Sequence, residues 1–140
     1  MDTARLKRAT KLKAIINTET NFADNIDYEY CFADGIHVLT LGLAFADAVA
    51  ELASGMAIDL ARGIARADRD LRQGVEAYEL EGNAASYRLM GAAIGLIGFG
   101  DLSRSFLKPV APFNCHIKVF DPRVPSYAIR KQVCTPAGLV

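Results

Sequence analysis

The chain of 140 residues lacks an excess of either charge, because its 16 basic residues equal its 16 acidic residues in number. Without net charge there is no long-range field to attract nucleic acid or an anionic membrane. It also lacks any apolar run near the length of about 18 residues that a membrane-spanning helix needs. We therefore expect neither nucleic acid nor a membrane among its partners.

Cysteine is scarce as well. Cys31, Cys115 and Cys134 are an odd number and lack the close spacing of a zinc site or a disulfide framework. Residues 1–15 are basic but contain no apolar core of the kind that a signal peptide has. These absences predict a reducing, cytoplasmic compartment and no metal site.

The residues that are present favour a globular α/β protein. Hydrophobic residues make up 51% of the chain, well above the content of a disordered sequence. Apolar runs at 12–17 and 36–41 predict two strands, and 27–33 predicts a short helix between them, so that the strands are parallel. Asp24 and Asp27, which resemble a carboxylate pair, are interpreted as a turn and a helix cap.

A long helix is predicted over residues 44–62, with a charged continuation over 65–73. Its polar side chains fall in one narrow stripe and the rest of its surface is apolar. A helix of this kind needs cover from a sheet, a second helix or another subunit, so we predict that it is buried and interfacial. The residues of the stripe are Asp47, Glu51, Ser54, Asp59 and Arg62.

A glycine-rich turn follows the apolar strand predicted at 92–97. Gly98 permits a tight turn, and Gly100 permits the main chain to approach a pyrophosphate closely. This is the Rossmann dinucleotide-binding pattern with one change, since Ser103 occupies the third position, where glycine is usual. Serine is small enough for that packing.

The predicted helix after this turn covers 104–108 and is expected to end at Pro109, with the Ser103 hydroxyl as its cap. The backbone N–H groups of Asp101, Leu102 and Ser103 lie at the positive end of the helix, where phosphates bind.

The second strand, predicted over 115–120, ends at Asp121, which lies 21 positions after Gly100. A carboxylate at this point accepts hydrogen bonds from the adenosine ribose and disfavours the 2′-phosphate of NADP, so the predicted cofactor is NAD. The alternative is a purely structural strand–helix–strand turn.

His37 and His116 are interpreted as partly buried strand residues without a catalytic role, and Cys115 as a small packed hydrophobe.

These motifs together resemble a known family. LMG at 89–91, IGLIGFGDLSR at 94–104 and FDP at 120–122 are similar to the NAD-binding start of the D-isomer-specific 2-hydroxyacid dehydrogenases. This is the family of phosphoglycerate dehydrogenase and glyoxylate or hydroxypyruvate reductase. Residues 12–27 and 35–52 are similar to the end of that family's substrate domain and the helix that follows it.

The resemblance implies an α/β fold in which an incomplete Rossmann dinucleotide-binding unit follows a long interdomain helix and the end of a flavodoxin-like substrate domain. The boundaries that it implies are 1–43 for the remnant of the substrate domain, 44–75 for the interdomain and dimerisation helix, and 76–140 for the first part of the NAD-binding domain. It also implies a homodimer.

Members of the family transfer hydride between NAD(H) and a 2-keto or 2-hydroxy acid, using an arginine, a histidine and a glutamate. No position of this chain matches those three residues. The resemblance therefore implies a fragment that retains the pyrophosphate and ribose site, has no catalytic residues and is inactive alone. The alternative is a non-catalytic nucleotide-binding or dimerisation module related to the family. Thr20 and Phe22 replace loop glycines that meet the substrate in most members.

Overall fold

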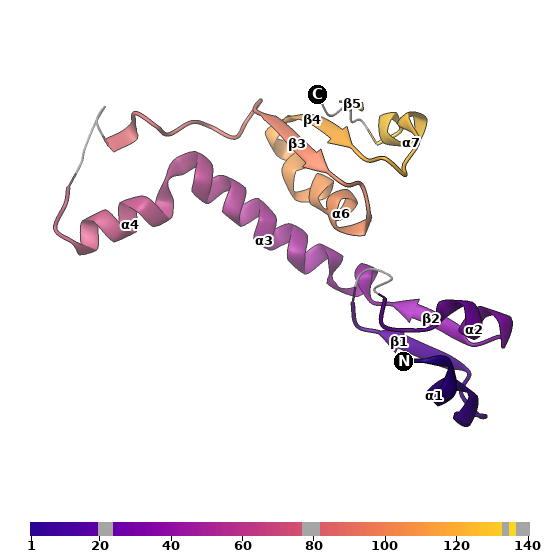
Figure 1. Ribbon diagram of the computed structural model, residues 1–140. Coiled ribbons are helices and arrows are strands. Elements are labelled where there is room, and N and C mark those ends of the chain that lie inside the picture. Colours follow the sequence, from indigo (N-terminus) through magenta and orange to yellow (C-terminus); the bar gives the residue numbers. More distant parts are fainter. Residues whose placement is uncertain (20–23, 77–81, 133–134, 137–140) are drawn as a thin grey trace. The chain divides into compact units, whose positions relative to one another are not determined.

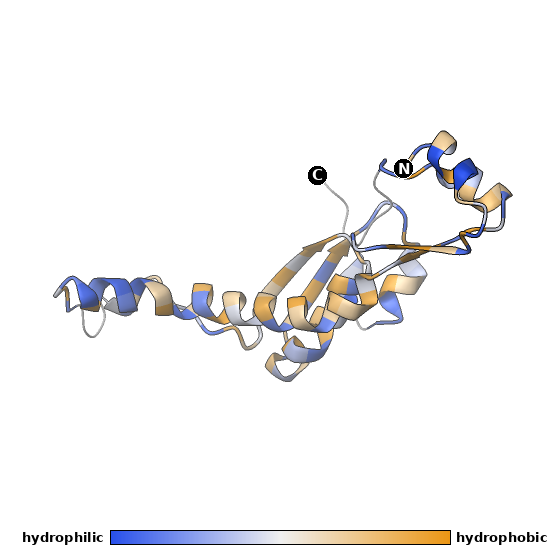
Figure 2. Cartoon of the chain, turned by 90° about the horizontal axis from the view of Figure 1, so that it is seen from below, coloured by the Kyte–Doolittle hydropathy of each residue, from blue (hydrophilic) through white to orange (hydrophobic). Residues whose placement is uncertain are grey.

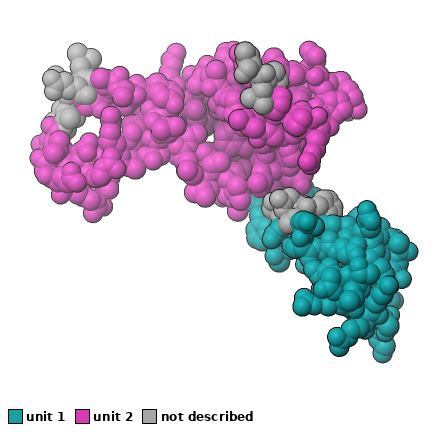
Figure 3. All heavy atoms as spheres, in the orientation of Figure 1, with its two compact units in different colours: residues 1–45 teal, residues 46–140 magenta. Residues whose placement is uncertain are grey.

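The computed structural model describes residues 1–19, 24–76, 82–132 and 135–136. Thr20, Phe22 and Cys134, which the sequence analysis names, lie outside these ranges. The chain divides into two compact units, Met1–Phe45 and Ala46–Val140 (Figure 3).

The first unit is a strand–helix–strand layer with one additional helix. Its strands β1 (Ala14–Asn17) and β2 (His37–Thr40) pair in parallel (Figure 1). Helix α2 (Tyr28–Ala33) connects them, and α1 (Thr3–Arg8) precedes them. Leu6, Cys31 and Ile36 form the buried core between these elements. The predicted parallel pair is confirmed.

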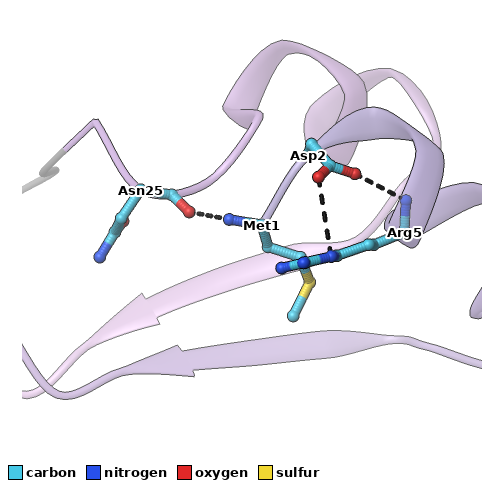
Figure 4. A network of polar contacts seen from close by, with 4 residues as sticks. All are labelled: Met1, Asp2, Arg5 and Asn25. Carbon is cyan, nitrogen blue, oxygen red and sulfur yellow. Dashed lines mark hydrogen bonds and ion pairs between the residues drawn. The ribbon is translucent and has the colours of Figure 1, made fainter.

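Aspartate side chains begin both helices of this unit. The Asp2 carboxylate accepts the N–H of Arg5 at 2.9 Å, and the N-terminal amino group donates to the carbonyl of Asn25 (Figure 4). Asp27 accepts the N–H of Tyr30 at 3.0 Å at the start of α2, as the sequence predicts. These caps satisfy N–H groups that a helix leaves without an internal acceptor.

The second unit contains a parallel three-stranded sheet in the order β3-β4-β5. β3 and β4 run parallel, side by side (Figure 1). Their register runs from Ala93 opposite His116 to Ile97 opposite Phe120. The sheet and its glycine turn confirm the Rossmann-type α/β fold. The elements, in chain order, are α3 (Gly42–Arg62, which begins in the first unit), α4 (Ile64–Arg72), β3 (Ala93–Ile97), α6 (Asp101–Val110), a 3-10 turn (Ala111–Phe113), β4 (His116–Phe120), α7 (Ser126–Arg130) and β5 (Thr135–Pro136).

Two predictions about α6 are wrong. The helix begins at Asp101 with Gly100 as its N-cap, so Ser103 lies inside the first turn and its hydroxyl does not cap the helix. The helix also continues through Pro109 to Val110. A proline in the last turn removes only one N–H donor, that for the carbonyl of Ser105, and a 3-10 turn starts directly afterwards.

The long helix α3, predicted to be covered by a sheet, a second helix or another subunit, is covered on one side only within the single chain. Ala50 packs against Phe106 and Val110 of α6, which covers one side of α3. On the other side Leu52, Met56 and Leu60 are 66%, 64% and 75% exposed. The apolar character of α3 contrasts with the hydrophilic α4 (Figure 2).

Ser54, which the sequence places on the polar stripe of α3, is instead buried, and its hydroxyl donates to the carbonyl of Ala50 at 2.7 Å. Serine in a helix satisfies its hydroxyl in this way without reaching water, and its small size permits close packing. Within the described ranges, no helix has both the length and the apolar character needed to cross a bilayer.

Candidate nucleotide-binding site

The glycine turn between β3 and α6 is the centre of the site. Gly98 has φ +90°, a conformation that other residues rarely adopt, and its N–H donates to the carbonyl of Phe120 at 2.8 Å. A Cβ added at Gly98 or at Gly100 would meet no atom within 4 Å. The space beside the turn is therefore open, as a bound pyrophosphate requires.

Helix α6 presents its first N–H groups at this turn. Its N-cap, Gly100, has an extended backbone (φ −80°, ψ −163°) and no side chain that could accept those N–H groups. The N–H of Arg104 bonds to the Gly100 carbonyl at 3.1 Å, which closes the first turn. The N–H groups of Asp101, Leu102 and Ser103 therefore have no acceptor within the helix, and an anion is the natural acceptor there.

The Asp121 carboxylate is bound to the same turn. Its Oδ2 accepts the N–H of Phe99 at 2.6 Å, and its Oδ1 accepts the N–H groups of Arg123 and Val124 at 2.8 Å and 3.0 Å. These hydrogen bonds, that of Arg123 first and that of Phe99 next, lower the pKa of Asp121 below its usual value. A carboxylate has about four acceptor positions, so acceptor capacity remains for a ribose hydroxyl.

Phe99, which sequence reasoning did not identify, anchors the turn. Its side chain is 1% exposed and packs against Val119 and Ile129. The guanidinium carbon of Arg104 lies 5.4 Å from the centre of the ring. A large aromatic residue between two glycines is the signal that was available for this anchor, since burial of the ring fixes the main chain on either side.

The structure thus brings Gly98, Gly100 and the start of α6 next to Asp121. His37 and His116 are exposed, contrary to the sequence-based interpretation that they are partly buried. The Cys115 thiol donates to the carbonyl of Leu89 at 3.2 Å and is only partly buried. In the part of the chain that the structure describes, no three histidine, cysteine or acidic side chains are grouped as metal ligands.

A parallel sheet with a glycine turn at the start of a helix, and an acidic residue at the end of the next strand, defines a Rossmann-type dinucleotide-binding unit. The family model described as the D-isomer specific 2-hydroxyacid dehydrogenase, NAD binding domain, matches residues 54–139. The chain belongs to this family, which confirms the resemblance found in the sequence. NAD is the cofactor of the matched domain.

Named relatives agree with this assignment. The chain is 38% identical over 124 residues to a hydroxypyruvate reductase of Thermotoga maritima, covering 88% of this chain and 39% of the relative. It is 31% identical over 121 residues to a D-3-phosphoglycerate dehydrogenase of Methanocaldococcus jannaschii, covering 86% of this chain and 22% of the relative. The chain therefore spans less than half the length of these curated relatives.

A solved structure is similar over nearly the whole chain. It is that of a phosphoglycerate oxidoreductase from Rhizobium etli, with a TM-score of 0.86 and 40% sequence identity. The match covers 99% of this chain and 44% of the solved chain. The likeness includes residues of both compact units, so the order of elements within each unit is similar to that in the solved oxidoreductase.

Proposed function

We propose that this chain binds the pyrophosphate and adenosine ribose of NAD(H) at the turn between β3 and α6. The observation that carries the proposal is the hydrogen bond from the Phe99 N–H to the Asp121 carboxylate, which holds the ribose acceptor beside the phosphate-binding turn. The binding residues are Gly98, Gly100, Asp101, Leu102, Ser103 and Asp121.

The residues present fit this cofactor. The missing Cβ atoms of Gly98 and Gly100 leave room for the phosphates, and the first N–H groups of α6, which begins directly after Gly100, have no side-chain cap. The Asp121 carboxylate orients the ribose, and steric and charge repulsion there disfavours a 2′-phosphate. When bound, the cofactor supplies a nicotinamide that accepts or donates hydride.

We further propose that the parent reaction is hydride transfer between NAD(H) and a 2-keto or 2-hydroxy acid in the cytoplasm. The names of the two relatives support this reaction class. Reduction of a keto acid needs a carboxylate anchor and a proton donor beside the nicotinamide. No residue of the 140 matches the arginine, histidine and glutamate of the family, so these residues alone bind the cofactor without turnover.

The proposed domain organisation keeps the boundaries 1–43, 44–75 and 76–140, with the middle segment as a dimerisation helix. An exposed apolar stripe on α3 supports a homodimer, because Val49, Leu52, Met56 and Leu60 recur at helical spacing and are 41–75% exposed. Charged replacement of the two central residues, Leu52→Lys with Met56→Glu, is expected to convert the dimer into a monomer in sedimentation velocity. A monomeric wild-type chain contradicts this proposal.

The same stripe favours a second candidate function, that of a non-catalytic dimerisation module of the family. Reading the coding sequence beyond Val140 separates the two candidates. A frame that continues with the family's arginine, glutamate and histidine supports a dehydrogenase. A stop codon together with abundant, stable product supports the module.

The cofactor proposal is tested with Gly100→Ala. The backbone at Gly100 tolerates alanine and the added Cβ contacts no protein atom, so the fold should be unchanged. The methyl group occupies the space of the pyrophosphate, and we expect NAD affinity to fall about tenfold or more in calorimetry. Gly95→Ala in β3 is the matched control, since its Cβ is equally free of contacts but lies outside the turn. Equal NAD binding by both variants would contradict the proposal.

A further inference from the structure

Asp101, the first residue of α6, stands apart from the other groups at the glycine turn. Its side chain is exposed at the positive end of the helix. Across 1–19, 24–76, 82–132 and 135–136, no side chain or N–H group forms a hydrogen bond or ion pair with its carboxylate. Asp121, by contrast, accepts three backbone N–H groups and is committed to the turn.

The position of Asp101 has opposite consequences for the free helix and for a bound phosphate. A negative side chain in the first turn stabilises the free helix through the helix dipole. Side chains of a helix lean toward its N-terminus, so this carboxylate lies over the N–H groups that receive the pyrophosphate. Carboxylate and pyrophosphate carry the same sign of charge, and they compete for the same positive end.

We propose that Asp101 limits the affinity of the site for the pyrophosphate; this inference rests on the proposed NAD function. Two like unit charges about 7 Å apart in water repel each other enough to weaken binding by a factor of about three. The two phosphate charges together correspond to about 3- to 10-fold after screening by salt. Because screening weakens the repulsion, the effect of Asp101 decreases as salt rises.

The test compares variants by calorimetric titration with three probes, NAD⁺, ADP-ribose and adenosine, at low and high salt. Asp101→Asn is expected to bind NAD⁺ and ADP-ribose about 3- to 10-fold more tightly at low salt, and the gain should shrink at high salt. Adenosine, which has no phosphate, should bind all variants equally. Asp101→Glu keeps the negative charge at the start of α6 and is therefore expected to show no gain in affinity for NAD⁺ or ADP-ribose.

Asp68→Asn is the matched control, because it removes the same charge from an exposed residue of α4. A gain for Asp101→Asn that Asp68→Asn reproduces would overturn the inference, as would an equal gain with adenosine. If the wild type binds ADP-ribose and Asp101→Asn binds it no more tightly, only this inference fails. If neither wild type nor variant binds ADP-ribose, the proposed function fails with it.

Discussion

Helices α2 and α6 occupy equivalent places in the two units, since each connects two parallel strands. Their first turns differ. In α2 the Asp27 carboxylate accepts the N–H of Tyr30 and a hydrogen bond from the Thr3 hydroxyl, whereas the N-cap of α6 is Gly100, which has no side chain. The same topology therefore yields a closed helix start in one unit and an open one in the other, and only the open start can receive an anion.

The largest expected effect comes from closing the open helix start. Gly100→Asp places at α6 the cap that α2 already has, and the extended backbone of residue 100 suits a capping side chain. We expect NAD affinity to fall about 100-fold, because the new carboxylate accepts hydrogen bonds from the N–H groups and repels phosphate. The measurement is calorimetric titration with NAD⁺.

Stability separates this effect from unfolding. An aspartate cap in place of glycine adds about a few tenths of a kcal/mol to the free energy of unfolding. Loss of NAD binding with an unchanged or slightly raised melting temperature supports the conclusion that the open start of α6 binds the cofactor. Retained binding would mean that the first N–H groups of α6 do not contact the cofactor.

The second prediction concerns the effect of low pH on two carboxylates. Asp27 caps the start of α2, and Asp121 is hydrogen-bonded to the turn that precedes α6. Hydrogen bonds lower the pKa of Asp27, that from Thr3 first and that from Tyr30 next, and they also lower the pKa of Asp121. A carboxyl group with a folded pKa below its unfolded value of about 3.9 stabilises the fold above that value, and the stability is lost as pH falls through the folded pKa. We therefore expect the melting temperature to fall as the pH drops below about 4.

The double variant Asp27→Asn with Asp121→Asn tests this assignment, because neither amide can titrate. Its melting temperature should depend less on pH in that range than the melting temperature of the wild type. Each single variant should remove part of the dependence. An identical acid transition in all four proteins would assign the loss of stability to other carboxyl groups.

The comparison of the two helix starts also shows what the sequence can predict. The strand at 92–97, the turn glycines and the spacing to Asp121 are local patterns, and the structure places these residues together. The cap residue of α6 was misassigned because Ser103 is a good capping residue by type, whereas the backbone at Gly100 decides where the helix begins. The spacing of residues in the sequence does not determine the backbone dihedral angles of Gly100.

The exposure of α3, the short strand β5 and the burial of Phe99 cannot be predicted from the sequence, for a different reason. An apolar helix surface predicts that something covers it, but not what does, so α3 was expected to be buried although Leu52 and Leu60 are exposed in the single chain. Strand β5 consists of Thr135 and Pro136 alone, which is too short to show any alternation. The burial of Phe99 depends on Ile129, 30 positions further along the chain.

Opening the closed helix start has a smaller expected effect than closing the open one. Asp27→Ala removes the acceptor for the Tyr30 N–H, and the first turn of α2 then depends on water. We expect a melting temperature lower by a few degrees, measured by circular dichroism, with NAD affinity unchanged. Asp27→Asn is the control, since asparagine caps as well as aspartate and should restore most of the loss. A change in NAD affinity would show that α2 also contributes to the nucleotide site.

The smallest expected effect is that of Gly55→Ala in the middle of α3, which touches neither helix start. Gly55 is exposed, and a Cβ there would meet no atom of the single chain within 4 Å. Alanine restricts the unfolded chain and should raise the free energy of unfolding by about 0.5–1 kcal/mol, measured by urea denaturation, with NAD affinity unchanged. This gain presupposes that the space beside Gly55 is free, although Gly55 adjoins Met56 of the exposed stripe. A loss of stability that grows with protein concentration would instead place a second copy of the chain against this part of α3.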